Sequence, residues 1–496
     1  MQSGDSSPHD LEAGSSWTTR SDPDGGRTWA REVKDAWLPC YLCLDGGGVR
    51  SYSSLLILKS LMHEVWMWEN RLADEEEDLD DATGPVVGEK KVVPSENELL
   101  PCHYFDFFVG TSSGGIIATL LGRLRMTVDE ATEAYLTITH AMFGHPTWNV
   151  VYDHTPMQSC IRAIVAARCT IHTNCTGDDE FREGMPHGRN RESSFAVDEP
   201  RQAQTACLSA LCDTINSEAF PLRTYPLFYS GDGSDWIMRY EEGPSSLTIT
   251  QVLRATTATP MYFRPLKAFQ FNRLKTLCDG GLRQNNPSPF ALSELRSLYE
   301  LSINPALFLS IGSGKPEVFP SRIKRYLSRI LYLSGSYATA IRFFLFFTQL
   351  PTFVQILAWL LMRPLKALAD VMMQDFRHKG EIQHGEMREH ARGEHTWYKR
   401  LNVRSGLGDS AGPSMDKWQD GHFGAGHTSG GATLRKIYDA TMQYVNREYE
   451  ATIDSYAAPG DVIRQAAEKL VRHRRAREAG GGRRYDVFVG REAGPA

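Results

Sequence analysis

Residues 105–115 read Phe-Asp-Phe-Phe-Val-Gly-Thr-Ser-Ser-Gly-Gly. The apolar first half has the character of a strand that ends at Gly110, and the apolar residues from Ile116 onward indicate a buried helix. Ser112 therefore stands at the centre of a Gly-x-Ser-x-Gly sequence between a strand and a helix, which is typical of a nucleophile elbow. The small neighbouring residues permit the sharp turn, and the N-terminus of the next helix favours negative charge there. We predict that Ser112 is a nucleophile; the alternative is an ordinary glycine-rich loop.

A second strand–loop–helix unit precedes the first. The apolar run Pro39–Leu44 leads into Asp-Gly-Gly-Gly-Val-Arg-Ser at 45–51, and apolar residues at helical spacing follow. Consecutive glycines let backbone N–H groups approach an anion, so the loop fits either a dinucleotide site or an oxyanion hole made by Gly47 and Gly48. A P-loop is excluded because no Gly-Lys-Ser/Thr follows. Arg50 either supports this loop, adds positive charge for an anionic head group, or pairs on the surface.

A third turn lies late in the chain. The segment 248–257 is predicted to be a helix that Thr259-Pro260 closes, and Phe271–Cys278 is predicted to be a strand that runs into Asp279-Gly-Gly. Two glycines after the aspartate allow other backbone or a substrate to come close. Asp279 is therefore either a catalytic carboxylate or part of a plain Asp-Gly turn. A helix at 288–298 and a strand at 306–311 are expected to follow.

Composition limits the classes of function. The 496 residues allow one large domain or two to three smaller ones, and a net charge of −6 leaves no overall basic field for nucleic acid. Nine scattered cysteines indicate reduced thiols and a cytoplasmic location. Cys169, His172 and Cys175 are close in sequence but lack a fourth ligand, so no metal site is predicted.

The three glycine-containing motifs together resemble the patatin-like phospholipase family. They are Asp45-Gly-Gly-Gly-Val-Arg, Gly110-Thr-Ser-Ser-Gly-Gly and Asp279-Gly-Gly, and they occur in the family's order. The segments 255–263, 281–287 and 309–314 match further family patterns, and 400–403 with 406–408 does so more faintly. The resemblance covers about residues 38–315.

This resemblance implies a three-layer α/β/α fold related to the α/β hydrolases, with a C-terminal helical extension. It also implies hydrolysis of lipid acyl esters by a Ser–Asp dyad without histidine or cofactor. Ser112 corresponds to the nucleophile, Asp279 to the base, and Gly46, Gly47 and Gly48 to the oxyanion hole. The departure is Ser51, where the family usually has glycine. A lipid-binding or scaffolding protein on the same fold, an acyltransferase and a nucleotide-binding protein are the alternatives.

The remaining segments divide the chain. We expect a disordered tail at 1–36, a catalytic domain at 37–315 with flexible polar insertions near 70–99 and 169–200, a hydrophobic and basic helical segment at 316–400, and a partly helical region at 401–496. The basic cluster 472–475 is expected to be a solvated helix end. A rival Ser–acid–His triad would need one of the six histidines that follow Asp279, but none of them lies in a recognisable motif. They are His378, His384, His390, His395, His422 and His427.

The segment 318–369 suggests a lipid surface. It contains seven basic residues and no acidic one, and 343–362 is a run of 20 uncharged residues that Pro351 interrupts. An interfacial helical pair, a buried packing element and a membrane span are all compatible with this pattern. An enzyme that cleaves lipid esters must reach a bilayer or a droplet, which favours peripheral contact with a membrane or lipid-droplet surface.

Overall fold

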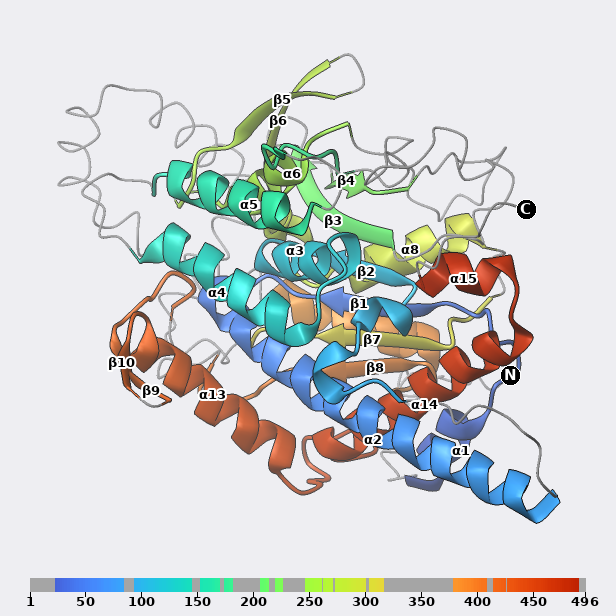
Figure 1. Ribbon diagram of the computed structural model, residues 1–496. Helices are drawn as coiled ribbons and strands as arrows, with labels where there is room; N and C mark the ends of the chain where they lie inside the picture. Colours follow the sequence, from blue (N-terminus) through green and yellow to red (C-terminus); the bar gives the residue numbers. More distant parts are fainter. Residues whose placement is uncertain are drawn as a thin grey trace, which may run out of the picture.

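An eight-stranded, mostly parallel sheet forms the centre of the computed structural model (Figure 1). The structure describes residues 23–83, 93–144, 152–169, 174–181, 206–213, 219–225, 246–260, 262–270, 273–299, 303–315, 378–407, 414–424 and 426–489. The strands of the sheet are β1 (Cys40–Leu44), β2 (Phe107–Gly110), β3 (Ala206–Asp213), β4 (Ala219–Arg223), β5 (Leu266–Gln270), β6 (Arg273–Asp279), β7 (Leu307–Ile311) and β8 (Tyr398–Leu401).

The strand order is β5-β6-β3-β2-β1-β7-β8, and β4 pairs with β3. The run from β3 to β8 is parallel, whereas β4 and β6 are antiparallel to β3 and β5 is antiparallel to β6. Parallel strands place their carboxyl ends at one edge, so Leu44 of β1 and Gly110 of β2 are register partners. The two glycine loops that follow these strands therefore begin side by side.

Both faces of the sheet are covered, which explains why its central strands are apolar throughout. Leu42 and Leu44 belong to the larger core, together with side chains of the helices in front of the sheet in Figure 1. Tyr41 and Cys43 point to the opposite face, where α8 and the helical residues 378–391 pack. This alternation gives three layers, α/β/α, as the sequence predicted.

The helices follow the sheet in chain order. The α-helices are α1 (Pro23–Arg31), α2 (Tyr52–Thr83), α3 (Ser113–Ala118), α4 (Val128–Phe143), α5 (Thr155–Arg168), α6 (Ile249–Thr256), α7 (Gly281–Gln284), α8 (Ser288–Leu298), α13 (Gly431–Asn446), α14 (Pro459–Gly480) and α15 (Arg483–Val489). Short helical turns are η1 (Gly48–Ser51), η2 (Glu96–Glu98), η3 (Pro101–His103) and the π-helical η4 (Thr119–Arg123), and β9 (Gly421–Phe423) and β10 (Gly426–Thr428) form a separate hairpin.

Capping boxes mark the starts of two helices near the predicted site. Thr127 and Glu130 form the capping box that begins α4, and Thr248 and Gln251 form one at the start of α6. The helix at 288–298 and the strand that ends at Asp279 are confirmed.

Three expectations for the periphery are wrong. Part of the tail expected to be disordered is helix α1. The backbone carbonyls of Trp29 in this helix and of Glu32 just after it accept hydrogen bonds from Lys469. The acidic stretch expected to be a flexible insertion is instead the continuation of α2 to Thr83. The basic cluster 472–475 lies within α14, where Arg475 is 8% exposed and pairs with the buried Glu69.

Several expectations fall outside the described residues. They include the apolar run 343–362, Gly408, most of the insertion 169–200 and His172. Within the described ranges, no helix is both long and apolar enough to cross a membrane.

Candidate active site

Ser112 occupies a strained turn between β2 and α3. Its φ is 56° and its ψ is −125°, a backbone conformation that non-glycine residues rarely adopt, with a typical cost of about 1–3 kcal/mol. The turn requires glycines beside it, because a Cβ on Gly114 would lie 2.3 Å from the carbonyl oxygen of Leu44. The backbone N–H of Ser112 donates to Thr256 Oγ1 at 3.0 Å, so the end of α6 also fixes the turn. This geometry is that of a nucleophile elbow.

Asp279 ends β6 and is buried, with 3% of its surface exposed. Its Oδ1 accepts a hydrogen bond from the backbone N–H of Gly281 at 2.8 Å, and its Oδ2 accepts one from the hydroxyl of Thr259. Burial raises the pKa of Asp279, while hydrogen bonds from Thr259, Gly281 and the Ser112 side chain oppose that rise. The structure thus brings the two predicted catalytic side chains, Ser112 and Asp279, into one buried site.

The loop at Gly46–Gly48 lies directly against this turn. A Cβ built on Gly46 would be 3.0 Å from the Cβ of Ser112, so only glycine allows the backbone to come this close without a shift. The N–H groups of Gly47 and Gly48 both donate to Ser113 Oγ at 2.9 Å, and the N–H of Gly46 donates to the carbonyl of Asn285 at 3.2 Å. The predicted oxyanion donors are therefore adjacent to Ser112 but already have partners.

Side-chain hydroxyl groups also hold the Gly46–Gly48 loop in place. Ser51 Oγ lies 2.7 Å from Ser113 Oγ, and Tyr135 donates to the carbonyl of Gly48 at 2.5 Å. The sequence departs from the family pattern at Ser51, and this departure adds a hydrogen bond to the loop. Sequence reasoning missed both Ser113 and Tyr135, since neither belongs to a spacing rule for oxyanion sites.

Arg50 also supports the loop. Its exposed fraction is only 4%, and its Nε donates to the carbonyl of Gly47 at 3.3 Å. The surface pairing considered for Arg50 is thus wrong, and the loop-supporting alternative is the one that the geometry favours.

A buried ion pair anchors the beginning of the loop. Arg400 of β8 binds Asp45 through both guanidinium nitrogens at 2.9 and 2.6 Å and also donates to Ser310 at 2.7 Å. Burial lowers the pKa of Arg400, but the Asp45 carboxylate outweighs this effect and raises it, so the arginine stays charged. The sequence contained only a faint signal for this contact, the family-like segment 400–403.

The described contacts of the histidines that follow Asp279 in the chain are with residues other than Ser112 and Asp279. His384 lies 3.1 Å from the hydroxyl of Tyr398 and 3.3 Å from Glu394, and His422 faces His427 across the β9–β10 hairpin. The described contacts of the Asp279 carboxylate are with Thr259, Gly281 and the Ser112 side chain, and none of them is with a histidine.

This combination of a three-layer α/β/α fold and a serine on a strained strand–helix turn defines a class of hydrolase-like proteins related to the α/β hydrolases. Comparison with protein families is more specific, because the family described as patatin-like phospholipase matches residues 42–292, just over half of the chain. The chain belongs to the patatin-like phospholipase family.

Individual relatives are distant. The chain is 27% identical over 219 residues to the calcium-independent phospholipase A2-gamma of Homo sapiens, a match that covers 44% of this chain and 25% of that protein. It is 25% identical over 253 residues to the probable inactive patatin-like protein 9 of Arabidopsis thaliana, a match that covers 48% of this chain and 56% of that protein. VipD from Legionella pneumophila matches with 12% identity and a TM-score of 0.28 over 60% of this chain and 53% of that one, which adds nothing to the assignment.

Proposed function

We propose that this chain is a serine lipid acyl hydrolase of the phospholipase A type, in which Ser112 is the nucleophile and Asp279 is the base. The observation that carries the proposal is the pairing of a strained, glycine-enclosed Ser112 with a buried Asp279. A buried carboxylate with a raised pKa is a better base than a solvated one. Membership in the family and the name of the human relative support the substrate class.

The reaction proceeds through an acyl-serine. Asp279 takes the hydroxyl proton as Ser112 attacks the ester carbonyl, and collapse of the tetrahedral oxyanion releases the alcohol with that proton. Water then attacks the acyl-Ser112 with Asp279 again as base. No step requires a metal ion.

The oxyanion takes over the backbone N–H donors that the Ser113 hydroxyl binds in the resting loop. In the resting loop one neutral hydroxyl oxygen accepts from both Gly47 and Gly48. Hydrogen bonds to an ionised acceptor are roughly twice as strong as those between neutral groups, so an oxyanion formed at Ser112 competes well for these donors. Each such donor is worth about 3–4 kcal/mol in the transition state.

The test compares Ser112→Ala and Asp279→Asn with wild type on a short-chain nitrophenyl ester and on phospholipid vesicles. Loss of the nucleophile should lower kcat by about 1,000-fold or more, and loss of the base by about 100- to 10,000-fold. Ser297→Ala, whose hydroxyl bonds only within α8, and Asp129→Asn, an exposed carboxylate, are matched controls that should keep full rates.

Other outcomes would redirect the assignment. A wild-type protein that binds vesicles but cleaves neither substrate would favour a lipid-binding role, whereas transfer of the acyl group to an added alcohol in preference to water would favour an acyltransferase. Full activity of Asp279→Asn would place the base elsewhere.

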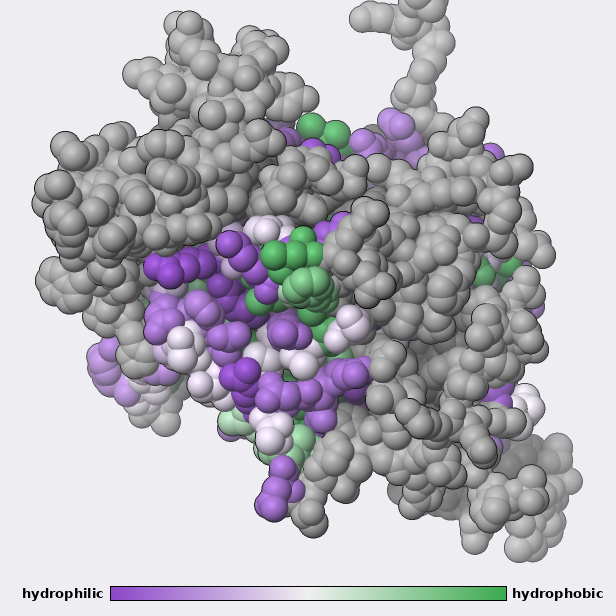
Figure 2. Space-filling model, turned by 90° about the horizontal axis from the view of Figure 1, so that it is seen from above, coloured by the Kyte–Doolittle hydropathy of each residue, from purple (hydrophilic) through white to green (hydrophobic). Residues whose placement is uncertain are grey.

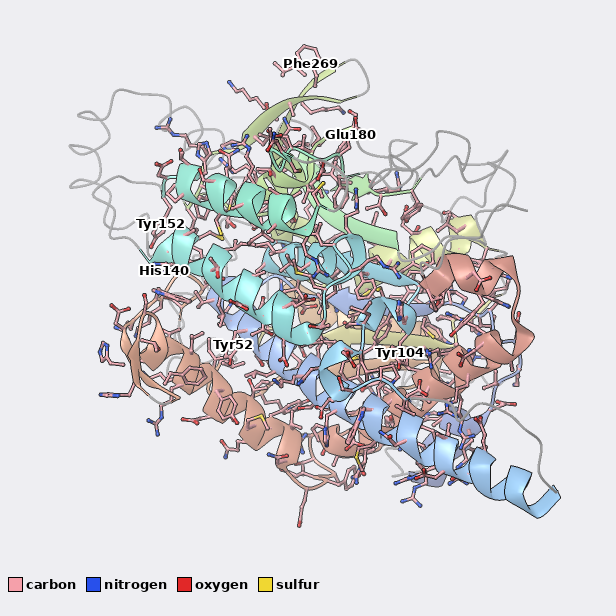
Figure 3. The ribbon with its side chains drawn as sticks, in the orientation of Figure 1. Tyr52, Tyr104, His140, Tyr152, Glu180 and Phe269 are labelled. Atoms are coloured by element: carbon pink, nitrogen blue, oxygen red, sulfur yellow. The ribbon has the colours of Figure 1, made fainter. Side chains whose placement is uncertain are left out.

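The same proposal includes peripheral attachment of a cytoplasmic protein to a membrane or lipid droplet. The β5–β6 hairpin extends away from the body, and Figure 3 shows Phe269 at its outer end, far from Tyr104. Phe269 and Leu274 are register partners with exposed fractions of 71% and 58%. Seen from above the orientation of Figure 1, the described surface is mainly hydrophilic and carries one small hydrophobic group (Figure 2). The same hairpin carries Lys267 and Lys275. Exposed apolar residues together with lysines suit an anionic lipid surface, as does the basic composition of the segment 318–369.

The hairpin is tested by the double variant Phe269→Ser with Leu274→Ser. It should lose several-fold in rate on anionic vesicles and keep its rate on the soluble ester, because only interfacial contact is removed. Ile382→Ser, which alters another exposed apolar residue (54%), is the control. Equal losses on both substrates would show that the hairpin supports the site itself.

A further inference from the structure

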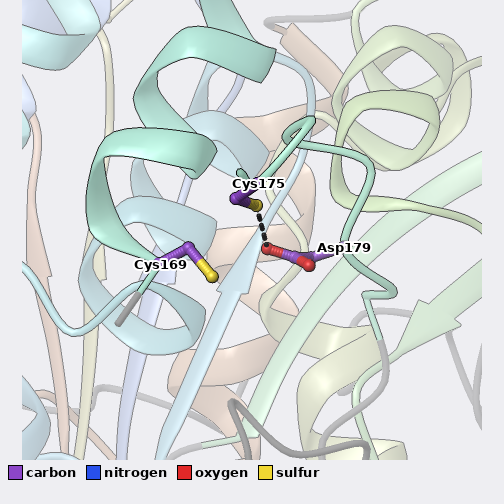
Figure 4. A group of neighbouring side chains, drawn as sticks. All are labelled: Cys169, Cys175 and Asp179. Atoms are coloured by element: carbon purple, nitrogen blue, oxygen red, sulfur yellow. Dashed lines mark hydrogen bonds between the residues drawn. The ribbon is translucent and has the colours of Figure 1, made fainter. Parts of the chain in front are cut away.

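Two thiols and a carboxylate meet where α5 ends. Cys169 follows the last residue of α5, and Cys175 and Asp179 lie on a loop beside the end of this helix (Figure 4). One ligand atom from each of the three residues lies within 4.8 Å of the other two, and all three residues are partly buried. The sequence paired these cysteines with His172, whereas the structure brings Asp179 to them.

One of the three distances between these atoms equals that of a tetrahedral metal site, and the other two are at most 4.8 Å. Cys175 Sγ lies 3.6 Å from Asp179 Oδ2. Around a tetrahedral zinc ion with Zn–S of about 2.3 Å and Zn–O of about 2.1 Å, a sulfur and an oxygen ligand are also about 3.6 Å apart. In the metal-free loop this contact is a hydrogen bond from the Cys175 thiol to the Asp179 carboxylate, and an ion would replace the thiol proton between the same two atoms.

The loop is rigidly fixed by its neighbours. A Cβ on Gly177 would lie 2.1 Å from the carbonyl oxygen of Arg162, so the turn packs directly onto α5 with a positive φ of 76°. Arg162 also pairs with Asp178 at 2.9 Å. Ligands on a preorganised turn lose little conformational entropy on binding.

We propose that Cys169, Cys175 and Asp179 bind one zinc ion, with water in the fourth position. On binding, two Zn–S bonds form while both thiol protons pass to solvent, and the carboxylate supplies the third ligand; no electron is transferred. Two thiolates and one carboxylate carry three negative charges, and a divalent, thiophilic cation offsets two of them.

The ion would stabilise the active site from a distance. The carbonyl of Asp179 accepts from the N–H of Ile249, and Glu180 forms a bridge with Thr248, so the loop holds the start of α6. The other end of this segment supplies the Thr256 and Thr259 hydroxyls that bind Ser112 and Asp279. The ion would therefore stabilise the fold around Ser112 and Asp279 without taking part in their chemistry.

The test measures metal content and thermal stability of the full chain rather than activity alone. Reduced, metal-free protein is titrated with Zn²⁺ and with Co²⁺, and the expected result is one ion per chain, a higher Tm and the Co²⁺ absorption bands of tetrahedral thiolate coordination. Cys169→Ser with Cys175→Ser, and separately Asp179→Asn, should weaken zinc binding by more than about 10-fold, a loss seen even when an outer partner of a ligand is removed. Cys160→Ser on the same helix is the matched control.

Two results would overturn the zinc site. One is zinc binding that persists unchanged in the double cysteine variant. The other is a wild-type protein that takes up no zinc, including one whose mass shows that Cys169 and Cys175 form a disulfide instead. Asp179→Asn keeps both thiols and the backbone contacts of the loop, so it reports on the ligand even if the double variant does not fold.

A chelator separates this inference from the proposed function. EDTA should lower the Tm of wild type but leave the initial rate on the soluble ester nearly unchanged at low temperature, because no chemical step uses the ion. If zinc binds as expected and no ester is cleaved, the hydrolase assignment fails alone. If the ester is cleaved and no zinc binds, the metal site fails alone.

Discussion

The chemistry of a Ser–Asp dyad depends on the ionisation of one buried residue. Asp279 accepts a proton only as a carboxylate, and its raised pKa means that this form is lost at a higher pH than for a solvated aspartate, whose pKa is about 3.9. The rate should therefore fall as the pH decreases through the raised pKa. Thr259 opposes that rise through its hydrogen bond to Oδ2.

Thr259→Val removes this hydrogen bond while keeping the side-chain volume nearly constant. The pKa of Asp279 should rise further, so the acid limb of the kcat/KM profile should move to higher pH, while the rate on the alkaline plateau changes less than in Asp279→Asn. Thr137→Val, which alters an exposed hydroxyl on α4, controls for the substitution. A profile that superimposes on that of wild type would show that Thr259 does not tune the base.

At the scale of elements, the Asp45–Arg400 pair joins the glycine loop to the edge strand β8. Both side chains are 4% exposed, and removing one partner of a buried pair typically costs about 3–5 kcal/mol because the other charge is left uncompensated. Arg400→Met should lower the free energy of unfolding by this amount and also reduce esterase activity, because Asp45 begins the loop. Urea denaturation measures the first effect and the short-chain ester assay the second.

An exposed pair provides the comparison. Arg435→Met breaks an ion pair with Asp439 in α13 whose side chains are 65% and 66% exposed, and such pairs are worth less than about 1 kcal/mol. Adding Asp45→Asn to Arg400→Met should recover part of the lost stability, since the isolated charge is gone. No recovery, together with a small effect of Arg400→Met alone, would contradict the anchoring role.

The limits of sequence reasoning follow from where each contact lies in the chain. The elbow around Ser112 and the helix predicted over 248–257 are contiguous patterns, so both could be predicted from the sequence. Arg400 lies 355 residues from Asp45, and no local pattern links two charges at that separation. Ser113 is an intermediate case. The sequence placed it in the elbow after Ser112, but it did not predict that the Ser113 hydroxyl accepts hydrogen bonds from the N–H groups of Gly47 and Gly48.

At the scale of the whole molecule, the C-terminal region completes the catalytic domain. The edge strand β8 belongs to the central sheet, and α14 packs against α2 and α1. The basic cluster appeared solvated from sequence because its acidic partner is distant: Glu69 lies 406 residues from Arg475. Helix α14 is thus held to α2 by buried ion pairs as well as by apolar packing.

Arg477 provides the sharpest test of this arrangement. It is 1% exposed, binds both carboxylate oxygens of Asp106 at 3.0 and 2.9 Å, and donates to the carbonyls of Ala36 and Leu38. Asp106 in turn accepts from the N–H of Cys40 at 2.7 Å, so this cluster ties the starts of β1 and β2 to α14. Arg477→Met leaves the Asp106 charge buried and should cost about 3–5 kcal/mol in the free energy of unfolding, measured by urea denaturation.

The matched control lies on the same helix. Arg464→Met removes an exposed arginine of α14 that pairs with Asp461, and it should change the free energy of unfolding by less than about 1 kcal/mol. If Arg477→Met proved as stable as Arg464→Met, the Asp106–Arg477 cluster would not be what holds α14 to the starts of β1 and β2. The expected large difference means instead that a truncation near residue 315 loses the β8 edge, the Arg400 anchor of the glycine loop and the α14 layer together, and therefore loses the active site with the fold.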